Sequence, residues 1–438
     1  MLIIFVMTVF TYFILVYINR KDFSSPSVLL SASFLMAAMI FIWNIDNWEL
    51  EIYGKTVIYV ATAMVAFSLG TFIVRCLTSK VTVINNTNYV ISHIEGRSFA
   101  GFAVISILCS SIYIAKNFKG VGNLLSFTQV LYMAYINATS TNESNVLLNQ
   151  MKEIPIAIAY VTTYVLMVAR DKKIRVKKLG LYISIVAFAI LSIMTTDRNI
   201  ILRYVIYTVC LWILFYKNRV DISKQKKNRT IVKKVIIILA VASVAFWGLG
   251  KAKQYTSNFE RAIGIYGGSG LYNFNLTVNN EEPLQYGAST FNALSSTVNA
   301  ILGHRSNEVI HGAFINYRSS NGYIYSSNIY SALKPYTNDF GYLGVILFPL
   351  IIGFFFEFLF HMTKRRSYGF TWVFYAMSIY PLLYFSIAEQ FFVRFHMGRV
   401  YEIFWVVFFY FIIFKVRVRF ASSANSPEII VKRLDKDE

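Results

Sequence analysis

The chain of 438 residues has little charge: only 15% of its residues are Asp, Glu, Lys or Arg, whereas 56% are hydrophobic. Soluble domains carry about 25% charged residues, so this composition excludes an ordinary water-soluble enzyme. The high hydrophobicity also excludes intrinsic disorder as the state of the whole chain. Cysteine is scarce as well. Cys76, Cys109 and Cys210 form no CxxC pair and no cluster with histidine, which argues against a disulfide framework or a zinc site.

Motifs for nucleotide and metal chemistry are missing too. The sequence contains neither GxxxxGK[ST] nor HExxH, so it offers no P-loop and no zinc-protease motif. The segments expected on the outer side of the membrane hold no clustered pair of aspartates for a divalent cation. A bound phosphate would therefore be neutralised by arginine, and we expect neither a metal nor a cofactor.

Long apolar runs are what the sequence has instead. A helix that spans a membrane needs about 20 mainly apolar residues, and irregular backbone is not tolerated against lipid. The runs therefore predict an all-α polytopic membrane protein with about eleven or twelve transmembrane helices. A twelfth helix would lie in 117–137 or 286–303. The eleven runs are 2–18, 27–44, 56–75, 98–115, 154–169, 179–196, 200–216, 235–250, 341–360, 370–388 and 402–416.

Basic residues concentrate on alternate connections. The loops after the first, third, fifth, seventh and ninth runs, together with the C-terminal tail, hold 28 basic and 8 acidic residues, and the rest of the chain holds 14 of each. The whole net charge of +20 thus lies on one side, which the positive-inside rule identifies as cytoplasmic. This places the N-terminus outside and the C-terminus inside. A nucleic-acid partner is not needed to explain the charge.

This topology divides the chain into four parts. Residues 1–250 hold eight transmembrane helices, 251–340 form one large extracytoplasmic loop, 341–416 hold the last three helices, and 417–438 form a cytoplasmic tail that we expect to be disordered. The large loop is polar, rich in Asn, Ser, Tyr and Gly, and far longer than an ordinary connection. Long loops on a rigid scaffold often carry function.

One arginine lies where a substrate phosphate could be bound. Arg198 falls in a short turn between the runs 179–196 and 200–216, which holds it at the outer membrane boundary. Arginine binds phosphate through two parallel hydrogen bonds and stays charged at any relevant pH. The alternatives are a snorkelling side chain or a local pair with Asp197. Arg203, further into the next helix, is more simply explained by snorkelling.

A second group lies between the last two predicted helices. Arg394 and Arg399 occur there among aromatic residues, together with Glu389 and His396. The two arginines could clamp an anionic headgroup. The alternative is an interfacial aromatic belt with snorkelling cations. Glu357, inside the helix predicted over 341–360, is expected to be a packing or snorkelling group rather than part of a site.

A third group lies toward the end of the large loop. A histidine or aspartate beside a sugar hydroxyl could act as a general base, and tyrosine and asparagine suit carbohydrate through stacking and amide hydrogen bonds. Taken singly, each loop histidine is more often uninvolved. The group comprises His304, Arg305, Glu308, His311, Arg318 and Asp339.

Two short segments carry a family resemblance. The run Asn328–Leu333, followed by Tyr336 and Asn338–Gly344, leads into a helix with Pro349 and Gly353. This resembles the end of the main outer loop in oligosaccharide repeat unit polymerases, the O-antigen polymerases of the Wzy-dependent pathway. The polar turn Thr196–Asn199 is similar to one that opens a central helix in that family.

The resemblance implies a metal-independent, lipid-dependent glycosyltransferase of GT-C-like architecture in the bacterial inner membrane, with its active site facing the periplasm. Such an enzyme transfers the growing glycan from undecaprenyl diphosphate to the non-reducing end of a new lipid-linked repeat unit. Its expected partners are undecaprenyl-diphosphate-linked oligosaccharides, membrane lipid and a chain-length regulator. A flippase of lipid-linked oligosaccharide, an O-antigen ligase and an O-acyltransferase remain open as alternatives.

The resemblance and the three groups together define the expected site. One of the arginines 394 and 399 would join Arg198 in holding the donor diphosphate, and His311 or Asp339 would accept the proton of the acceptor hydroxyl. Asp339 has a rival role, since it precedes a predicted helix and could cap it. The expected substrate-binding residues are Arg198, Arg305, Arg394, Arg399, Asn328 and Tyr330, and the expected catalytic residues are His311 and Asp339.

Overall fold

The described part of the chain packs into two units that interleave along the sequence. Unit 1 comprises Met1–Thr82, Thr256–Arg365 and Ser378–Arg399, and unit 2 comprises Val83–Tyr255, Arg366–Met377 and Val400–Glu438. Each unit is thus built from separated stretches and not from one linear block of the sequence. The computed structural model describes residues 2–44, 48, 52–78, 84–85, 87–117, 129, 146–195, 197–219, 248, 262–279, 283–304, 315–318, 324–420 and 429–433.

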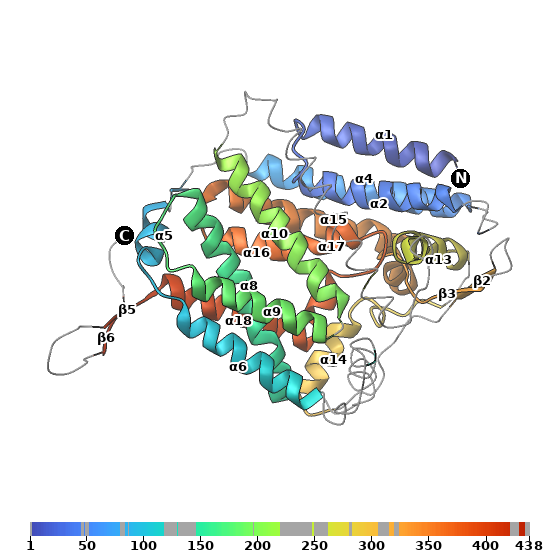
Figure 1. Ribbon diagram of the computed structural model, residues 1–438. Coiled ribbons are helices and arrows are strands. Elements are labelled where there is room, and N and C mark those ends of the chain that lie inside the picture. The colour runs from blue at the N-terminus through green and yellow to red at the C-terminus, as the bar shows by residue number, and fades with distance from the viewer. Residues whose placement is uncertain are drawn as a thin grey trace. The chain divides into compact units, whose positions relative to one another are not determined.

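Apolar helices dominate both units (Figure 1). In the described residues, six are long and apolar enough to cross a membrane: α2 (Pro26–Trp43), α4 (Gly54–Leu77), α8 (Val146–Asp171), α10 (Arg198–Arg219), α15 (Leu333–Arg365) and α18 (Met397–Phe414). Three shorter apolar helices are α1 (Leu2–Ile18), α6 (Ala100–Asn117) and α9 (Leu179–Met194). The protein is therefore a helical multi-pass membrane protein, as the sequence predicts. The predicted run 235–250 lies outside the described residues except for position 248.

Two of the remaining predictions differ from the structure. The run 370–388 is interrupted at Ile379 between α16 (Phe370–Ser378) and α17 (Tyr380–Tyr384). Pro381 lies in the first turn of α17, and proline has no backbone N–H with which to continue the preceding helix. Within 286–303 the structure forms only α14 (Asn292–Ile301), which at 10 residues rises about 15 Å and is too short for a span. The other candidate for a twelfth helix, 117–137, falls almost wholly outside the described residues.

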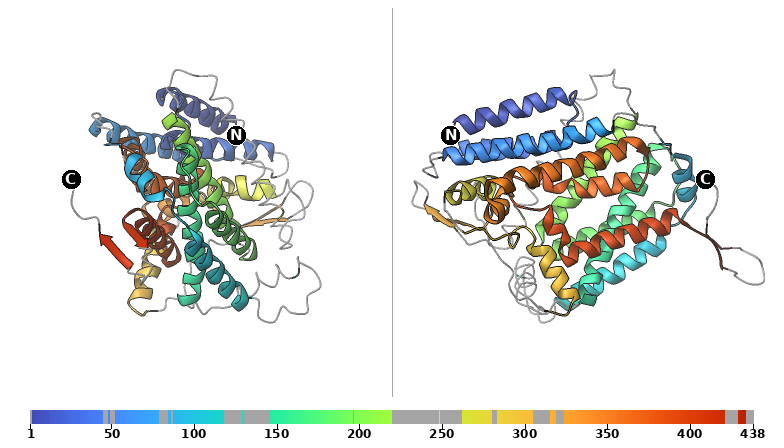
Figure 2. Two further views of the ribbon diagram at one scale, coloured as in Figure 1. Left: turned by 60° about the vertical axis from the view of Figure 1, so that its left-hand side comes forward. Right: turned by 180° about the vertical axis from the view of Figure 1, so that it is seen from behind.

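Unit 1 contains α1, α2, α4 and α15, which lie side by side in the views of Figures 1 and 2. The closest packing joins α4 to α15. A Cβ added to Gly70 would lie 2.1 Å from the carbonyl oxygen of Leu350, and one added to Gly353 would lie 2.3 Å from that of Phe67. In lipid, the hydrophobic effect does little to drive apolar helices together. Helix–helix contacts in membranes are therefore often formed by small residues, which let the two backbones approach each other.

The large loop is folded where the structure describes it. It contains a π-helical turn η1 (Gly264–Gly268), α13 (Ser269–Thr277), α14, and the antiparallel strands β2 (Ile315–Arg318) and β3 (Ile324–Ser327). Asn275 Oδ1 accepts hydrogen bonds from the backbone N–H of Tyr53 (3.0 Å) and the hydroxyl of Thr56 (2.7 Å). The loop is therefore anchored at the beginning of α4. A backbone reversal at Gly341 (φ 58°) then separates the start of α15 from its membrane-spanning part.

Unit 2 is built on α6, α8, α9 and α10, together with α5 (Thr87–Ile94) and most of α16 and α18. Strand β1 (Ile84–Asn85) pairs in parallel with β4 (Arg366–Ser367). Within the predicted tail 417–438, the described residues include most of β5 (Val416–Phe420), which pairs with β6 (Ile429–Arg433) in an antiparallel ladder, and the other tail residues lie outside the described part. Both segments are rich in β-branched residues, and Val416–Phe420 alternates them with arginine, a pattern typical of a strand.

The basic connections that the structure describes gather at one end of each unit. In unit 2 the backbone N–H of Gly96 donates to the carbonyl of Arg175 (3.0 Å), and the guanidinium of Arg97 donates to the carbonyl of Ile413 (2.6 Å). These contacts join the loops after the third and fifth predicted runs to the end of α18. All three were predicted to lie on the cytoplasmic side, and their convergence supports the alternation of sides predicted from charge.

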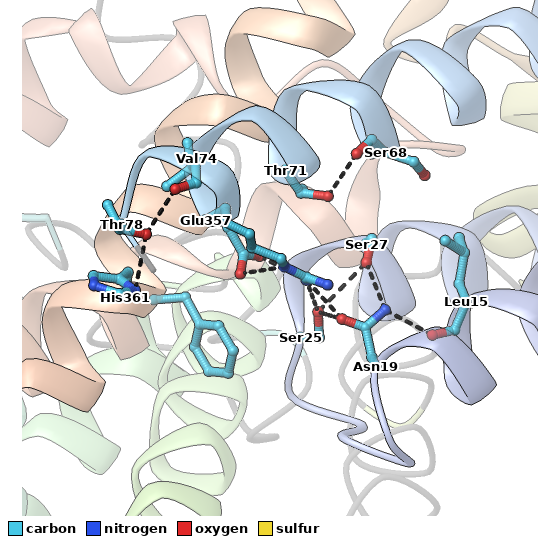
Figure 3. Close-up of polar contacts among 12 residues, drawn as sticks. Leu15, Asn19, Ser25, Ser27, Ser68, Thr71, Val74, Thr78, Glu357 and His361 are labelled. Atoms are coloured by element: carbon cyan, nitrogen blue, oxygen red, sulfur yellow. Dashed lines mark hydrogen bonds and ion pairs between the residues drawn. The ribbon is translucent and has the colours of Figure 1, made fainter. Parts of the chain in front are cut away.

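Unit 1 shows the same convergence near the end of α4, at the polar contacts of Glu357, Asn19 and Ser25 drawn in Figure 3, and the residue that joins them is Arg75. Its guanidinium binds both carboxylate oxygens of Glu357, with Nε–Oε1 at 2.8 Å and Nη2–Oε2 at 3.0 Å. Nη2 also donates to Asn19 Oδ1 (2.6 Å) and Ser25 Oγ (3.1 Å), which belong to the connection after α1. Glu357 is thus the helix-packing group that the sequence suggests, and Arg75 ties three segments together.

We expect Arg75→Lys to lower the free energy of unfolding by roughly 1–3 kcal/mol, because an ammonium cannot reproduce the two-pronged contact with Glu357 while also reaching Asn19 and Ser25. The measurement is the melting temperature of the purified protein in detergent. Arg365→Lys, at an exposed position of the same end, is the matched control and should melt like the wild type. Equal melting temperatures for both variants would contradict the role given to Arg75.

Candidate functional site

Unit 2 gathers ionisable side chains from three membrane helices at the end opposite its basic connections. Arg203 of α10 donates from Nη1 to Oε2 of Glu402 in α18 at 2.7 Å, and the two side chains are only 9% and 3% exposed. In α8, Lys152 Nζ lies 3.1 Å from Oε1 of Glu153, which is also buried. Such groups are costly at membrane depth and mark functional or structurally essential sites.

The two ion pairs belong to one network. Glu153 interacts electrostatically with both Arg203 and Glu402, and Lys152 interacts with Asp197 in the turn before α10. Pairing offsets the large cost of removing these charges from water. One atom is left over: Oε2 of Glu153 is buried and makes no hydrogen bond within the part of the chain that the structure describes. We call the network of these five residues the outer ion cluster.

Arg198 is the first residue of α10 and is half-buried. The preceding Asp197 accepts the backbone N–H of Asn199 on its Oδ1 (3.0 Å), which caps the helix start. The turn that carries Arg198 is therefore held by an aspartate that is itself a member of the outer ion cluster. Arg203 corrects the sequence-based interpretation: it does not snorkel outward but is buried against Glu402.

Sequence reasoning missed Lys152, Glu153 and Glu402. The run predicted over 154–169 begins just after the first two, whereas α8 begins at Val146 and includes both. The leucines at 147 and 148 and Met151 continue the apolar pattern of that helix toward its N-terminus. Extending the run by those two turns would have placed a lysine and a glutamate at membrane depth, which is the signal for a candidate site.

Asp339 lies in unit 1 and is completely buried. Its Oδ1 accepts the backbone N–H of Ser289 (3.0 Å) and its Oδ2 that of Thr290 (2.6 Å). Both oxygens are thus engaged in fixing the turn before α14. Asp339 accepts hydrogen bonds from backbone N–H groups, as a helix cap would. These N–H groups belong to a distant segment and not to its own helix. This geometry assigns Asp339 a structural role in the loop and leaves it poorly placed as a general base.

The second predicted group also serves the loop structure. Glu389 accepts the backbone N–H groups of Phe391 (2.7 Å), Phe392 (2.9 Å) and Val393 (3.2 Å), and so caps the 3₁₀ helix η2 (Phe392–Phe395). Burial raises the pKa of the Glu389 carboxyl, and the hydrogen bonds to the backbone act in the opposite direction. The hydrogen bonds of this carboxyl therefore fix the backbone conformation between α17 and η2.

Arg394 extends from η2 and is half-buried. Its guanidinium donates to the carbonyl oxygen of Ser378 and lies 5.6 Å from the ring centroid of Phe356 and 5.8 Å from that of Phe391. These contacts favour the aromatic-packing interpretation over a headgroup clamp. Arg399, in the first turn of α18, is also half-buried.

The two residues of the resembling motif differ in accessibility. Asn328 is exposed and so remains available to a polar ligand. Tyr330 is 9% exposed, and Lys334 Nζ lies 3.4 Å from its ring centroid, so one face of the ring is already covered. A stacking platform for sugar at this tyrosine would require Lys334 to move.

Of the eight expected site residues, five belong to unit 1 and Arg198 belongs to unit 2. The five are Asp339, Asn328, Tyr330, Arg394 and Arg399. The remaining two, His311 and Arg305, lie outside the described residues. Comparison with known proteins finds no match to a family model, a curated protein or a solved structure.

Proposed function

We propose that this protein polymerises lipid-linked oligosaccharide repeat units. It would transfer a growing glycan from undecaprenyl diphosphate to the non-reducing end of a new lipid-linked unit, on the periplasmic face of a bacterial inner membrane. About eleven or twelve spans and a GT-C-like architecture belong to the same proposal, as do a chain-length regulator as partner and the independence from metal.

The observation that carries the proposal is the outer ion cluster. It lies at the ends of α8, α10 and α18 that are opposite the basic connections, on the side that the charge pattern predicts to be extracytoplasmic. Arg198 begins α10 at that same boundary, where the diphosphate of a lipid carrier would lie. The resemblance of 328–344 and 196–199 to the polymerase family adds the reaction class.

The chemistry requires charge stabilisation and a proton acceptor. Negative charge grows on the diphosphate as the glycosidic bond to it breaks, and Arg198 would stabilise that charge through two hydrogen bonds. The acceptor hydroxyl must lose its proton. With both oxygens of Asp339 engaged, His311 is the other expected residue that could receive it.

The test is the surface glycan ladder of cells that lack this gene and are then complemented. Complementation by the wild type should restore the ladder, whereas the deletion should show a single repeat unit on a normal anchor. Loss of even the single unit would point to a flippase or ligase. An unchanged ladder in the deletion would overturn the proposal in favour of an O-acyltransferase.

Arg198→Ala should reduce polymer by about a hundredfold or more, because it removes a donor to the developing charge. Arg198→Lys, which keeps the charge but loses the two-pronged geometry, should give an intermediate ladder. Lys116→Ala removes an exposed charge from the end of α6 and serves as the control. Polymer of normal length and amount from Arg198→Ala, at equal protein level in the membrane, would refute the role of Arg198.

A further inference from the structure

The turn between α8 and α9 surrounds an open cavity of about 620 Å³ in unit 2. Two buried side chains, Ala169 and Ile174, form an apolar floor. Four basic residues of the lining are exposed around it. The cavity is lined by Ala169, Arg170, Lys173, Ile174, Arg175, Val176 and Lys178.

The positive charge of this cavity is not neutralised from within the turn. The turn has one acid, Asp171, which accepts a hydrogen bond from the hydroxyl of Tyr368 and lies 3.8 Å from Lys172 Nζ. In the described part of the chain, none of the four basic lining residues forms an ion pair with a carboxylate. Four cations thus surround a space that no acid of the described residues fills.

The turn is also held in a fixed conformation. Lys173 adopts a left-handed backbone (φ 55°), and the N–H of Ile174 donates to the carbonyl of Ala169 at 2.9 Å. Gly96 donates its N–H to the carbonyl of Arg175 (3.0 Å), and a parallel bridge joins Ser98 to Lys177. The backbone positions of the cations are therefore set before a ligand arrives, which lowers the entropy lost on binding.

We propose that this cavity binds the phosphate ester of an anionic phospholipid headgroup in the cytoplasmic leaflet. The basic connections place it at the cytoplasmic membrane boundary, where anionic headgroups are concentrated. A phosphodiester provides the negative charge for the basic rim, and the apolar floor suits the glycerol and the first methylenes of a lipid. A free phosphate also carries negative charge, but it has no apolar group that could contact the apolar floor. The inference does not depend on the polymerase proposal.

The test measures lipid retained by the purified protein in native mass spectrometry, after titration with phosphatidylglycerol, phosphatidylcholine or inorganic phosphate. Phosphatidylglycerol should bind more tightly than phosphatidylcholine. Replacing Lys173, Arg175 and Lys178 together with Gln should weaken phosphatidylglycerol binding by about a hundredfold, since each cation near a membrane surface contributes about 1 kcal/mol.

The matched control replaces Arg20, Lys21 and Arg365 with Gln, which removes the same charge from exposed positions in unit 1. It should retain phosphatidylglycerol as the wild type does. Equal weakening in both triple variants would overturn the proposal in favour of diffuse surface attraction. If inorganic phosphate bound as tightly as phosphatidylglycerol, the ligand would be a free phosphate and the lipid assignment would be wrong.

Discussion

Arg203→Ala is expected to lower the free energy of unfolding by about 3–5 kcal/mol, because it leaves the carboxylate of Glu402 buried without its partner at 2.7 Å. The measurement is the melting temperature in detergent. Lys116→Ala, which removes an exposed charge from unit 2, should melt like the wild type. A wild-type melting temperature for Arg203→Ala would mean that the pair does not stabilise the fold.

A double variant separates stability from chemistry. Replacing Arg203 with Met and Glu402 with Leu removes both charges and keeps much of the side-chain volume, so it should recover most of the lost stability. If the pair only holds α10 against α18, the glycan ladder should recover as well. A stable double variant without polymer would instead assign the pair a direct part in the reaction.

Much of the membrane architecture can be predicted from the sequence because it follows from local composition. The first apolar run coincides with α1, and the second, third and sixth differ from their helices by at most two residues at either end. Leucine, isoleucine, valine and phenylalanine exclude water wherever they form a long run, whatever the partner helix. The alternation of charge likewise depends on composition alone, and the convergence around Arg75 agrees with it.

The candidate site is harder to predict because its contacts join distant segments. Arg203 and Glu402 are 199 positions apart, and nothing in either local sequence indicates the other. Asp339 shows the same limit: its position before a helix suggests a cap, but the N–H groups that it binds belong to residues 289 and 290. Charge and burial could be anticipated at these positions, whereas the choice of partner is a property of the tertiary fold.

The backbone contact between α4 and α15 leaves no room for a larger side chain at the glycines that form it. Gly353→Leu should lower the free energy of unfolding by more than about 3 kcal/mol, because even its Cβ would lie 2.3 Å from the carbonyl oxygen of Phe67, so the two helices have to separate. Gly353→Ala should cost less, roughly 1–3 kcal/mol. At Gly70, too, the leucine variant should lose more stability than the alanine variant, since a Cβ there would lie 2.1 Å from the carbonyl oxygen of Leu350.

Gly101 in α6 is the matched control, because a Cβ there would meet nothing within 4 Å. Gly101→Ala should raise stability by about 0.5–1 kcal/mol through helix propensity alone. Comparing the variants at 70 and 353 with those at 101 separates the effect of the backbone contact from any general effect of replacing glycine in a membrane helix. If Gly353→Leu and Gly101→Leu melted at the same temperature, α4 and α15 could not be packed backbone to backbone. A graded loss at both 70 and 353, with none at 101, is expected because the contact requires small residues on both helices.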